Sequence, residues 1–317
     1  MKQCQAATDP NTAWPANMCP SLAGACIMAA LFGLTTITHV VQMVMTRKWY
    51  CWVICVSGVL QTAAYCLRAF SITHVTNDSV YSIWFILMMI APVWTNAFAF
   101  MVMGRMVYNF TGTASVYKVK AWHFGLIFVL LDVLAFFVQV GGASIASGEN
   151  TSYKTIMLGI HLYMGGIGFQ QACIFIFLFL SARLHLHLRQ QPPTPQRTTA
   201  FRLLYTEYAV VLLITCRIIF RLIEYSNGIE SAIPRQEAYQ YVFDSLMMLI
   251  ALALYNVFHP GRMMPGKEAN MPKRKERKTL KKLGQAPGGR AGEYLLVEKS
   301  PGMTAAVQEP HWAGESV

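Results

Sequence analysis

Long apolar runs separated by short polar connections make up most of the chain. Each run contains on the order of 20 residues, the length that an α-helix needs to cross the hydrocarbon core of a bilayer. The pattern therefore predicts an all-α membrane protein with seven transmembrane helices. The expected spans are Leu22–Met45, Trp49–Thr73, Tyr81–Val107, Trp122–Gly142, Thr155–Leu180, Leu204–Tyr225 and Tyr239–Phe258.

The composition favours the same class of protein. Of the 317 residues, 55% are hydrophobic and 13% are charged, whereas soluble domains contain about 25% charged residues. The first twenty residues lack the basic start and apolar core of a cleavable signal peptide, so the first span should be an uncleaved anchor. We expect an outer-side N-terminal tail over residues 1–20, the seven-helix domain over residues 21–261 and a basic tail over residues 262–317. The run KRKERKTLKK at residues 273–282 is basic and has no aromatic residue, so we expect the tail to be disordered.

Lysine and arginine residues are concentrated on one side of the predicted membrane. Connections rich in these residues tend to stay in the cytosol. The alternation places the N-terminus outside the cell or in a lumen and the C-terminus in the cytosol. The formal net charge of +11 indicates which side of the membrane each connection lies on. It does not indicate nucleic-acid binding, because no nucleic-acid-binding motif accompanies it. The rich connections contain Arg47, Lys48, Arg105, Lys118, Lys120, Arg183, Arg189, Arg197 and Arg202, and the poor ones contain Lys2, Lys154 and Arg235.

Two kinds of modification are predicted for the outer side. The sequons at Asn77 and Asn150 fall on that side and are candidate glycosylation sites, whereas the sequon at Asn109 falls on the inner side and should stay bare. Cys4 and Cys19 also lie on the outer, oxidising side. A disulfide between them and two free thiols are both open interpretations.

Charged residues gather where the sixth predicted span ends and the seventh begins. Arg217, Arg221 and Glu224 are spaced i, i+4 and i+7, so they share one face of a helix. Glu237 and Asp244 follow at the start of the next span. An ionisable residue inside a bilayer costs roughly 2.5–3.5 kcal/mol at the helix centre and usually faces a partner or a water-filled cavity.

Two further spans carry polar residues, and a third carries a group of glycines. Asp132 lies near the centre of the fourth span, and Gln139 follows seven residues later on the same face. A structural hydrogen bond to a neighbouring helix is the alternative role for Asp132. Arg68 lies in the outer third of the second span, where snorkelling to the headgroups is the simplest explanation. The glycines at residues 165–168 favour close packing of helices.

Two interpretations remain open for these polar residues. They either line a cavity that opens to the outer side, or they form an ion-pair network that locks the sixth helix to the seventh. The candidate substrate-binding residues are Arg68, Asp132, Gln139, Arg217, Arg221, Glu224, Glu237 and Asp244.

Several short segments spread over the membrane portion carry a family resemblance. They are YCLR at Tyr65–Arg68, APVWTNAFAFMVMGR at Ala91–Arg105, DVLAFFVQVGG at Asp132–Gly142, GIGFQ at Gly166–Gln170, RIIFRLIEYSNG at Arg217–Gly228, EAYQYVFD at Glu237–Asp244 and FHPG at Phe258–Gly261. Together they resemble the fungal lipid-translocating exporter family, the RTA-like seven-helix membrane proteins. The chain departs from the family pattern at Gln61, where a glutamate is expected, and at Phe100, where a tyrosine is expected.

The resemblance implies seven helices with the N-terminus outside and a role in lipid movement. The implied cargo is an amphipathic lipid such as a sphingoid long-chain base, or a lipophilic toxic compound. The alternative is a seven-helix receptor or regulator that responds to lipids or controls membrane lipid asymmetry. The plasma membrane is the expected location, with an endomembrane as the alternative.

Enzymatic function and bound cofactors are not expected. No Walker A pattern is present, so ATP is not bound by that route. His185 and His187 are a weak metal motif, so no metal site is predicted. The basic run at residues 273–282 should attract anionic lipids of the inner leaflet, by about 1 kcal/mol per positive charge near the surface.

Overall fold

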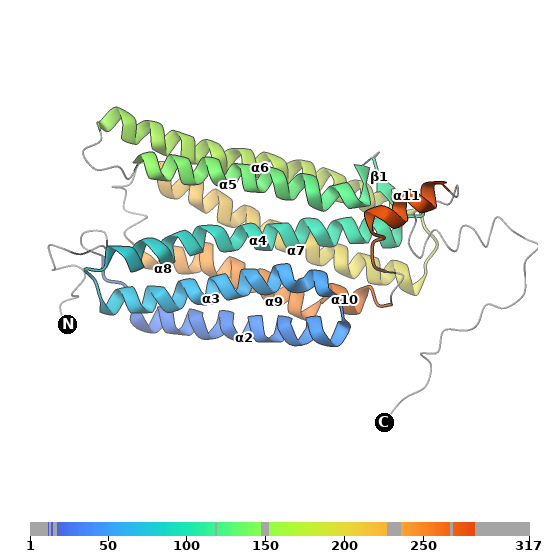
Figure 1. Ribbon diagram of the computed structural model, residues 1–317, viewed down its shortest axis with the longest axis horizontal. Helices are drawn as coiled ribbons and strands as arrows, with labels where there is room; N and C mark the ends of the chain where they lie inside the picture. Colours follow the sequence, from blue (N-terminus) through green and yellow to red (C-terminus); the bar gives the residue numbers. More distant parts are fainter. Residues whose placement is uncertain are drawn as a thin grey trace, which may run out of the picture.

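The computed structural model describes Thr12, Trp14 and residues 18–117, 119–146, 152–226, 236–266 and 269–282. Within these residues, 7 helices are long and apolar enough to cross a membrane, and they run side by side along the long axis of the molecule (Figure 1). The predicted all-α membrane fold with seven spans is confirmed. The helical segments are α2 (Leu22–Thr46), η1 (Trp49–Cys51) with α3 (Trp52–Thr73), α4 (Asp78–Phe110), α5 (Ala121–Ala146), α6 (Tyr153–Arg189), α7 (Pro195–Ser226), and α8 (Glu237–Gln240) with η2 (Tyr241–Ser245) and α9 (Leu246–Val257).

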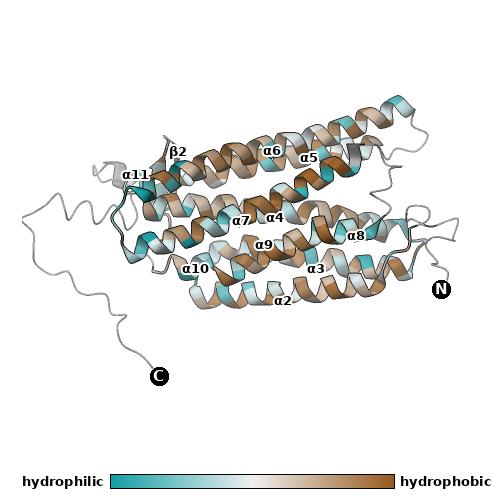
Figure 2. Ribbon diagram, turned by 180° about the vertical axis from the view of Figure 1, so that it is seen from behind, coloured by the Kyte–Doolittle hydropathy of each residue, from teal (hydrophilic) through white to brown (hydrophobic). Residues whose placement is uncertain are grey.

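Hydrophobic residues predominate along the middle of the helices (Figure 2). Large aliphatic and aromatic side chains are also exposed on the outside of the bundle, as expected for a surface that contacts acyl chains and not water. The chain is therefore an integral multi-pass membrane protein. Exposed apolar side chains include Leu34, Ile37, Val44, Leu126, Phe137, Phe175, Leu212 and Val257.

Neighbouring helices in the sequence are also neighbours in space. Helix α3 packs against α2 and α4, α5 packs against α4 and α6, and α7 contacts α6, α4 and α9. Helix α9 also packs against α2, which closes the bundle. We call the end that holds Trp14, the end of α3 and the start of α8 the Trp14 end, and the opposite end the Lys48 end.

Several short elements lie at the Lys48 end. A two-stranded antiparallel hairpin, β1 (Ser115–Val116) with β2 (Val119–Lys120), joins α4 to α5. Helix α10 (Pro260–Met263) follows α9. The FHPG motif explains how α10 begins, because the His259 ring accepts a hydrogen bond from the Gly261 N–H at 3.2 Å and Pro260 occupies the first turn, where it needs no donor.

Short polar side chains set where two helices begin at the Trp14 end. The side chain of Ser21 accepts a hydrogen bond from the Gly24 N–H at 3.1 Å, and that of Asn77 accepts one from the Val80 N–H at 3.1 Å. Asn77 is exposed, and its glycosylation stays a prediction. The predicted sites at Asn150 and Cys4 lie outside the described residues.

Part of the basic tail packs on the bundle. The ammonium group of Lys48 donates to the Gly266 carbonyl at 2.6 Å and to the side chain of Asn270 at 3.0 Å. Residues 274–282 form helix α11 (Arg274–Lys282), so the disorder expected for this run does not hold for them. Glu276 accepts from the Lys273 N–H at 2.8 Å and caps the helix start, which offsets part of the charge repulsion. Residues 283–317 lie outside the described residues.

Glycines allow α5 and α6 to approach closely. A methyl group at Gly142 would lie 2.7 Å from the carbonyl oxygen of Gly159, whereas nothing lies within 4 Å of one at Gly141. In the run at residues 165–168, Gly166 alone faces α5 in this way, and Gly165 and Gly168 have open space. The packing interpretation of these glycines therefore holds for Gly166.

The approach at Gly142 predicts a difference between two adjacent alanine variants. Both Gly142→Ala and Gly141→Ala gain the helix preference of alanine, but only Gly142→Ala forces α5 away from α6. We expect Gly142→Ala to lower stability by about 1–3 kcal/mol, the usual cost of overpacking. The thermal unfolding midpoint of each purified variant measures this difference, and equal midpoints for the two variants would contradict the packing described.

Candidate functional site

Four charged residues of α7 and η2 form a buried group that we call the four-charge cluster. One carboxylate oxygen of Asp244 accepts from Nε of Arg217, and the other accepts from Nη2 of Arg221. Nη1 of Arg221 donates to Glu224 at 3.0 Å. Asp244 is only 2% exposed. The two positive and two negative charges balance, which is how a bilayer protein keeps ionised groups inside. The face predicted for α7 is confirmed, and it meets the start of the seventh span.

A π-helical turn presents Asp244 to α7. Asp244 and the next residue, Ser245, both lie in η2. The hydroxyl of Ser245 is hydrogen-bonded to the hydroxyl of Tyr65 on α3, so two consecutive residues contact different helices. Turns of this kind are rare and often occur at functional sites. The apolar pattern predicted a helix here and contains no signal for the wider turn.

Glu237 does not join the four-charge cluster. It pairs instead with Arg68 of α3, whose Nη2 lies 2.8 Å from Oε1 of Glu237. Nη1 of Arg68 donates to the Gln240 side chain at 2.9 Å. The other oxygen of Glu237 accepts from the backbone N–H of Ser21 at 2.7 Å. These contacts join the start of the seventh span to α3 and to Ser21, the residue that caps the start of α2.

Aromatic rings surround the guanidinium group of Arg68. Its central carbon lies 5.3, 4.6 and 5.3 Å from the ring centroids of Trp14, Trp84 and Tyr241, within the range of cation–π attraction. Arg68 is 1% exposed. The snorkelling explanation for Arg68 is therefore wrong, because its charge is held inside the bundle by Glu237 and the rings. The polar N-terminal tail contained one signal for this arrangement, the single tryptophan Trp14.

Asp132 is held by amide side chains of two other helices. Nε2 of Gln170 on α6 donates to Asp132 at 2.5 Å, and Nδ2 of Asn96 on α4 lies 3.2 Å from its other oxygen. Gln139 joins through Gln170, with 3.2 Å between the two amides. No lysine or arginine pairs with Asp132 in the part of the chain that the structure describes. The geometry of Asp132 is therefore that of a carboxylate hydrogen-bonded to neighbouring helices, which was the alternative role given for it.

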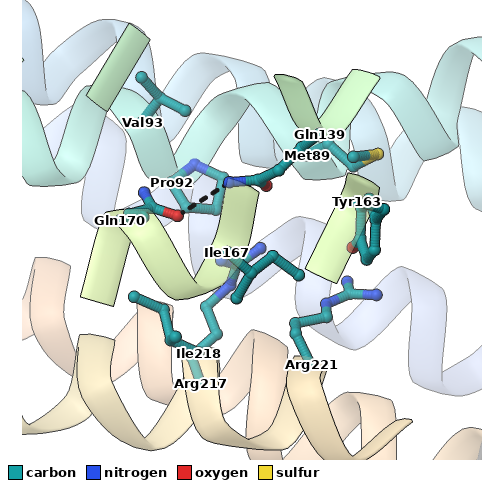
Figure 3. Close-up of a pocket in the computed structure, with 10 residues that line it drawn as sticks. All are labelled: Met89, Pro92, Val93, Gln139, Tyr163, Ile167, Gln170, Arg217, Ile218 and Arg221. Carbon is teal, nitrogen blue, oxygen red and sulfur yellow. Dashed lines mark hydrogen bonds between the residues drawn. The ribbon is translucent and has the colours of Figure 1, made fainter. Parts of the chain in front are cut away.

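A small cavity lies between the Asp132 group and the four-charge cluster. Gln139 and Gln170 border it from α5 and α6, and Arg217 and Arg221 border it from α7 (Figure 3). Pro92, in the middle of α4, also contributes to its wall. Its volume is about 20 Å³, which is enough for one water molecule, since a water needs roughly 10–15 Å³. A lipid headgroup does not fit in this arrangement of the helices.

The predicted site residues therefore divide into three groups. Two of these groups, the four-charge cluster and the Asp132 group, share the cavity, whereas Arg68 and Glu237 form a separate pair nearer the Trp14 end. One buried carboxyl was missed by the sequence analysis: Glu207 of α7, whose two oxygens each lie 3.2 Å from the Tyr255 hydroxyl of α9. An acidic residue near the start of an apolar run was the available signal.

A family model described as RTA1 like protein matches residues 53–267, from the start of α3 to the segment after α10. The chain belongs to the RTA1-like family. The matched region contains every charged residue of the three groups. The match confirms the resemblance seen in the short polar segments of the sequence.

Three named relatives of this RTA1-like chain come from fungi. The "Probable lipid transporter atnI" of Emericella nidulans is 37% identical over 270 residues, which cover 81% of this chain and 70% of that protein. The "Sphingoid long-chain base transporter RSB1" of Saccharomyces cerevisiae is 24% identical over 312 residues, covering 86% and 80%. The "Lipid-translocating exporter-like protein RTA1" of Leptosphaeria maculans is 24% identical over 259 residues, covering 74% and 49%. No solved structure matches the chain.

Proposed function

We propose that this protein translocates amphipathic lipids, of the sphingoid-base type, or lipophilic toxic compounds across a membrane. The observation that carries the proposal is the balanced, buried four-charge cluster beside an internal cavity in a membrane-spanning bundle. Ionisable side chains at such positions typically mark a substrate or ion pathway. The printed names of the relatives, two lipid transporters and one exporter-like protein, support the same role. The role is non-catalytic.

The four-charge cluster offers both kinds of headgroup contact. A cationic amine is attracted to the carboxylates of Glu224 and Asp244, and a phosphate is attracted to Arg217 and Arg221. Because these four charges already satisfy one another, a charged cargo has to replace one resident partner. Helix movement must accompany this exchange, since the cavity of about 20 Å³ is too small for a headgroup. The π turn η2 and Pro92 border the region that has to open.

The Arg68–Glu237 pair serves the same pathway closer to the Trp14 end. Glu237 adds a third carboxylate, and the rings of Trp14, Trp84 and Tyr241 are able to hold an organic cation as they hold the guanidinium of Arg68. Gln139 supplies a hydrogen-bond partner in the wall of the cavity, and Asp132 lies behind that wall, where it accepts a hydrogen bond from Gln170.

The Trp14 end faces the outside or a lumen in this proposal, and the Lys48 end faces the cytosol. The support is the excess of lysine and arginine in the connections at the Lys48 end. The plasma membrane is the proposed location. Glycosylation at Asn77 and Asn150 and a disulfide between Cys4 and Cys19 belong to the same outer side, and the basic residues of α11 contact anionic lipids of the inner leaflet.

Cellular accumulation tests this function. Cells with and without the protein are exposed to a labelled sphingoid base, a sterol analogue and a haem-like compound. We expect cells with the protein to accumulate less of at least the sphingoid base, because an exporter lowers the amount retained. Equal accumulation of every compound at normal abundance of the protein would contradict the proposal.

A further inference from the structure

An open groove lies between α4 and α5 at the Lys48 end, far from the four-charge cluster. Its volume is about 360 Å³, within the range of small-molecule sites, which begins at roughly 300 Å³. The internal cavity, at about 20 Å³, is far smaller. The residues that decide its shape are Met101, Gly104, Arg105, Gly125, Leu126 and Met271.

The groove opens towards the membrane and is covered at the Lys48 end. Gly104 of α4 and Gly125 of α5 line it where the two helices approach closely, since a methyl group at Gly104 would lie 2.7 Å from the Ala121 carbonyl oxygen. Leu126, which is 59% exposed, lies at its membrane side. Met271, from the segment that precedes α11, lines the groove at the Lys48 end. An acyl chain fits such a wall, because nearly all of it is apolar.

Positive charges flank the groove, and none of them forms an ion pair with a carboxylate of the residues that the structure describes. The guanidinium of Arg105, which lines it, stacks 3.5 Å from the ring centroid of Tyr50. Nε of Arg105 is buried and has no hydrogen-bond partner in the described ranges, and Nη1 of Arg277 is in the same situation. Trp122 is another lining residue. The central guanidinium carbon of Arg277 lies 4.6 Å from its ring centroid, and the ammonium nitrogen of Lys120 lies 5.7 Å from it.

Unpartnered guanidinium donors indicate what kind of ligand the groove takes. A buried charged donor without an acceptor is costly, and arginine binds phosphate through two parallel hydrogen bonds. Basic pockets between transmembrane helices on the cytoplasmic side are typical sites for anionic headgroups. The positive charges therefore lie at the Lys48 end of an apolar groove, which is the end where a lipid phosphate would lie.

We propose that this groove binds one anionic phospholipid of the surrounding membrane. One acyl chain lies along α4 and α5 past Leu126, and the phosphate contacts Arg105, with Arg277 and Lys120 nearby. The site is separate from the proposed translocation pathway. Only the leaflet that supplies the lipid depends on the orientation proposed above.

Intact-complex mass spectrometry of the purified full chain in neutral detergent tests this site. Phosphatidylserine and phosphatidylcholine with the same acyl chains are added separately. We expect one phosphatidylserine to be retained per chain, with an affinity about tenfold or more above that of phosphatidylcholine. Both lipids carry the phosphate, but only the serine headgroup adds a carboxylate, which makes one further charge-assisted contact with Arg277 or Lys120. This comparison requires no variant, so it does not depend on whether a variant folds.

Two matched pairs of variants locate the site. Arg105→Gln should lower phosphatidylserine affinity about tenfold, whereas Arg262→Gln, at an exposed arginine of α10 at the same end, should leave it unchanged. Leu126→Trp should fill the groove and reduce binding, whereas Leu134→Trp, at an exposed residue of α5 outside the groove, should not.

Equal retention of the two lipids would overturn the proposal and indicate ordinary boundary lipid. Normal phosphatidylserine binding by both Arg105→Gln and Leu126→Trp would also overturn it, because the lipid would then bind elsewhere on the protein. The binding assay measures no transport, so its failure and the failure of the translocation function are distinguishable.

Discussion

Asp244→Asn should destabilise the bundle strongly. The change keeps the size of the side chain but leaves Arg221 with Glu224 alone and Arg217 without an ionised carboxylate partner in the cluster. Breaking a buried ion pair by removing one partner typically costs about 3–5 kcal/mol, because a charge is left buried without compensation. We expect a marked fall in the thermal unfolding midpoint and in the abundance of the protein in the membrane.

The matched control for this change is Asp78→Asn. Asp78 is an exposed carboxylate in the first turn of α4, so the same chemical change there removes no buried partner. Its unfolding midpoint should stay close to that of the unaltered protein. If Asp244→Asn unfolded at the same temperature as Asp78→Asn, the four-charge cluster would not be a buried network.

Glu224→Gln should impair lipid movement while the protein still folds and reaches the membrane. Arg221 keeps Asp244 as an ionised partner, and the glutamine oxygen is still able to accept from Nη1 of Arg221. The variant nevertheless removes one of the two carboxylates of the cluster that attract a cationic headgroup. Loss of one charge-assisted contact predicts a fall of about tenfold or more in the transport rate.

This effect is measured in cells that accumulate a labelled sphingoid base. The transport rate is divided by the amount of the protein in the membrane. Asp78→Asn again serves as the control, because it removes one negative charge far from the cavity. A Glu224→Gln protein that moved the lipid at the normal rate and normal abundance would show that the cluster is structural and does not contact cargo.

The two variants separate the two interpretations that the charged residues allow. A network that only locks α7 to the seventh span loses stability when either carboxylate is removed. A network that also contacts cargo loses transport at Glu224 without a comparable loss of stability. The asymmetry follows from geometry, since Asp244 bridges both arginines and Glu224 contacts one of them.

The seven spans were predictable because the thickness of a bilayer sets the length of an apolar run. The shared face of Arg217, Arg221 and Glu224 was predictable because helical periodicity determines it. The pairing of these residues with Asp244 followed from the short connection between the two spans.

The partners of Arg68 were not predictable from the sequence. Glu237 was expected beside Arg217 and Arg221 because it is close to them in sequence, yet it pairs with a residue of α3. No local rule connects positions separated by 169 residues, and the closure of the bundle by α9 against α2 and α7 decides which of them meet. The π turn of η2 and the packing of Trp14 on Arg68 depend on tertiary contacts in the same way.

The groove between α4 and α5 also has no signature in the sequence. Gly104 and Gly125 read as ordinary residues of two apolar spans, and Arg105 reads as one of several basic residues on the side predicted to be cytosolic. Their juxtaposition depends on the packing of α4 against α5 and on the segment that brings Met271 over them.

Lipid flux in proteoliposomes that contain only the purified protein tests the proposed translocation most directly. A labelled sphingoid base is added on one side, its appearance on the other side is timed, and liposomes with Glu224→Gln and without protein are measured in parallel. We predict faster movement with the unaltered protein than in either control. Movement no faster than in protein-free liposomes, from protein that is folded and correctly inserted, would contradict translocation and favour a lipid-responsive receptor or regulator.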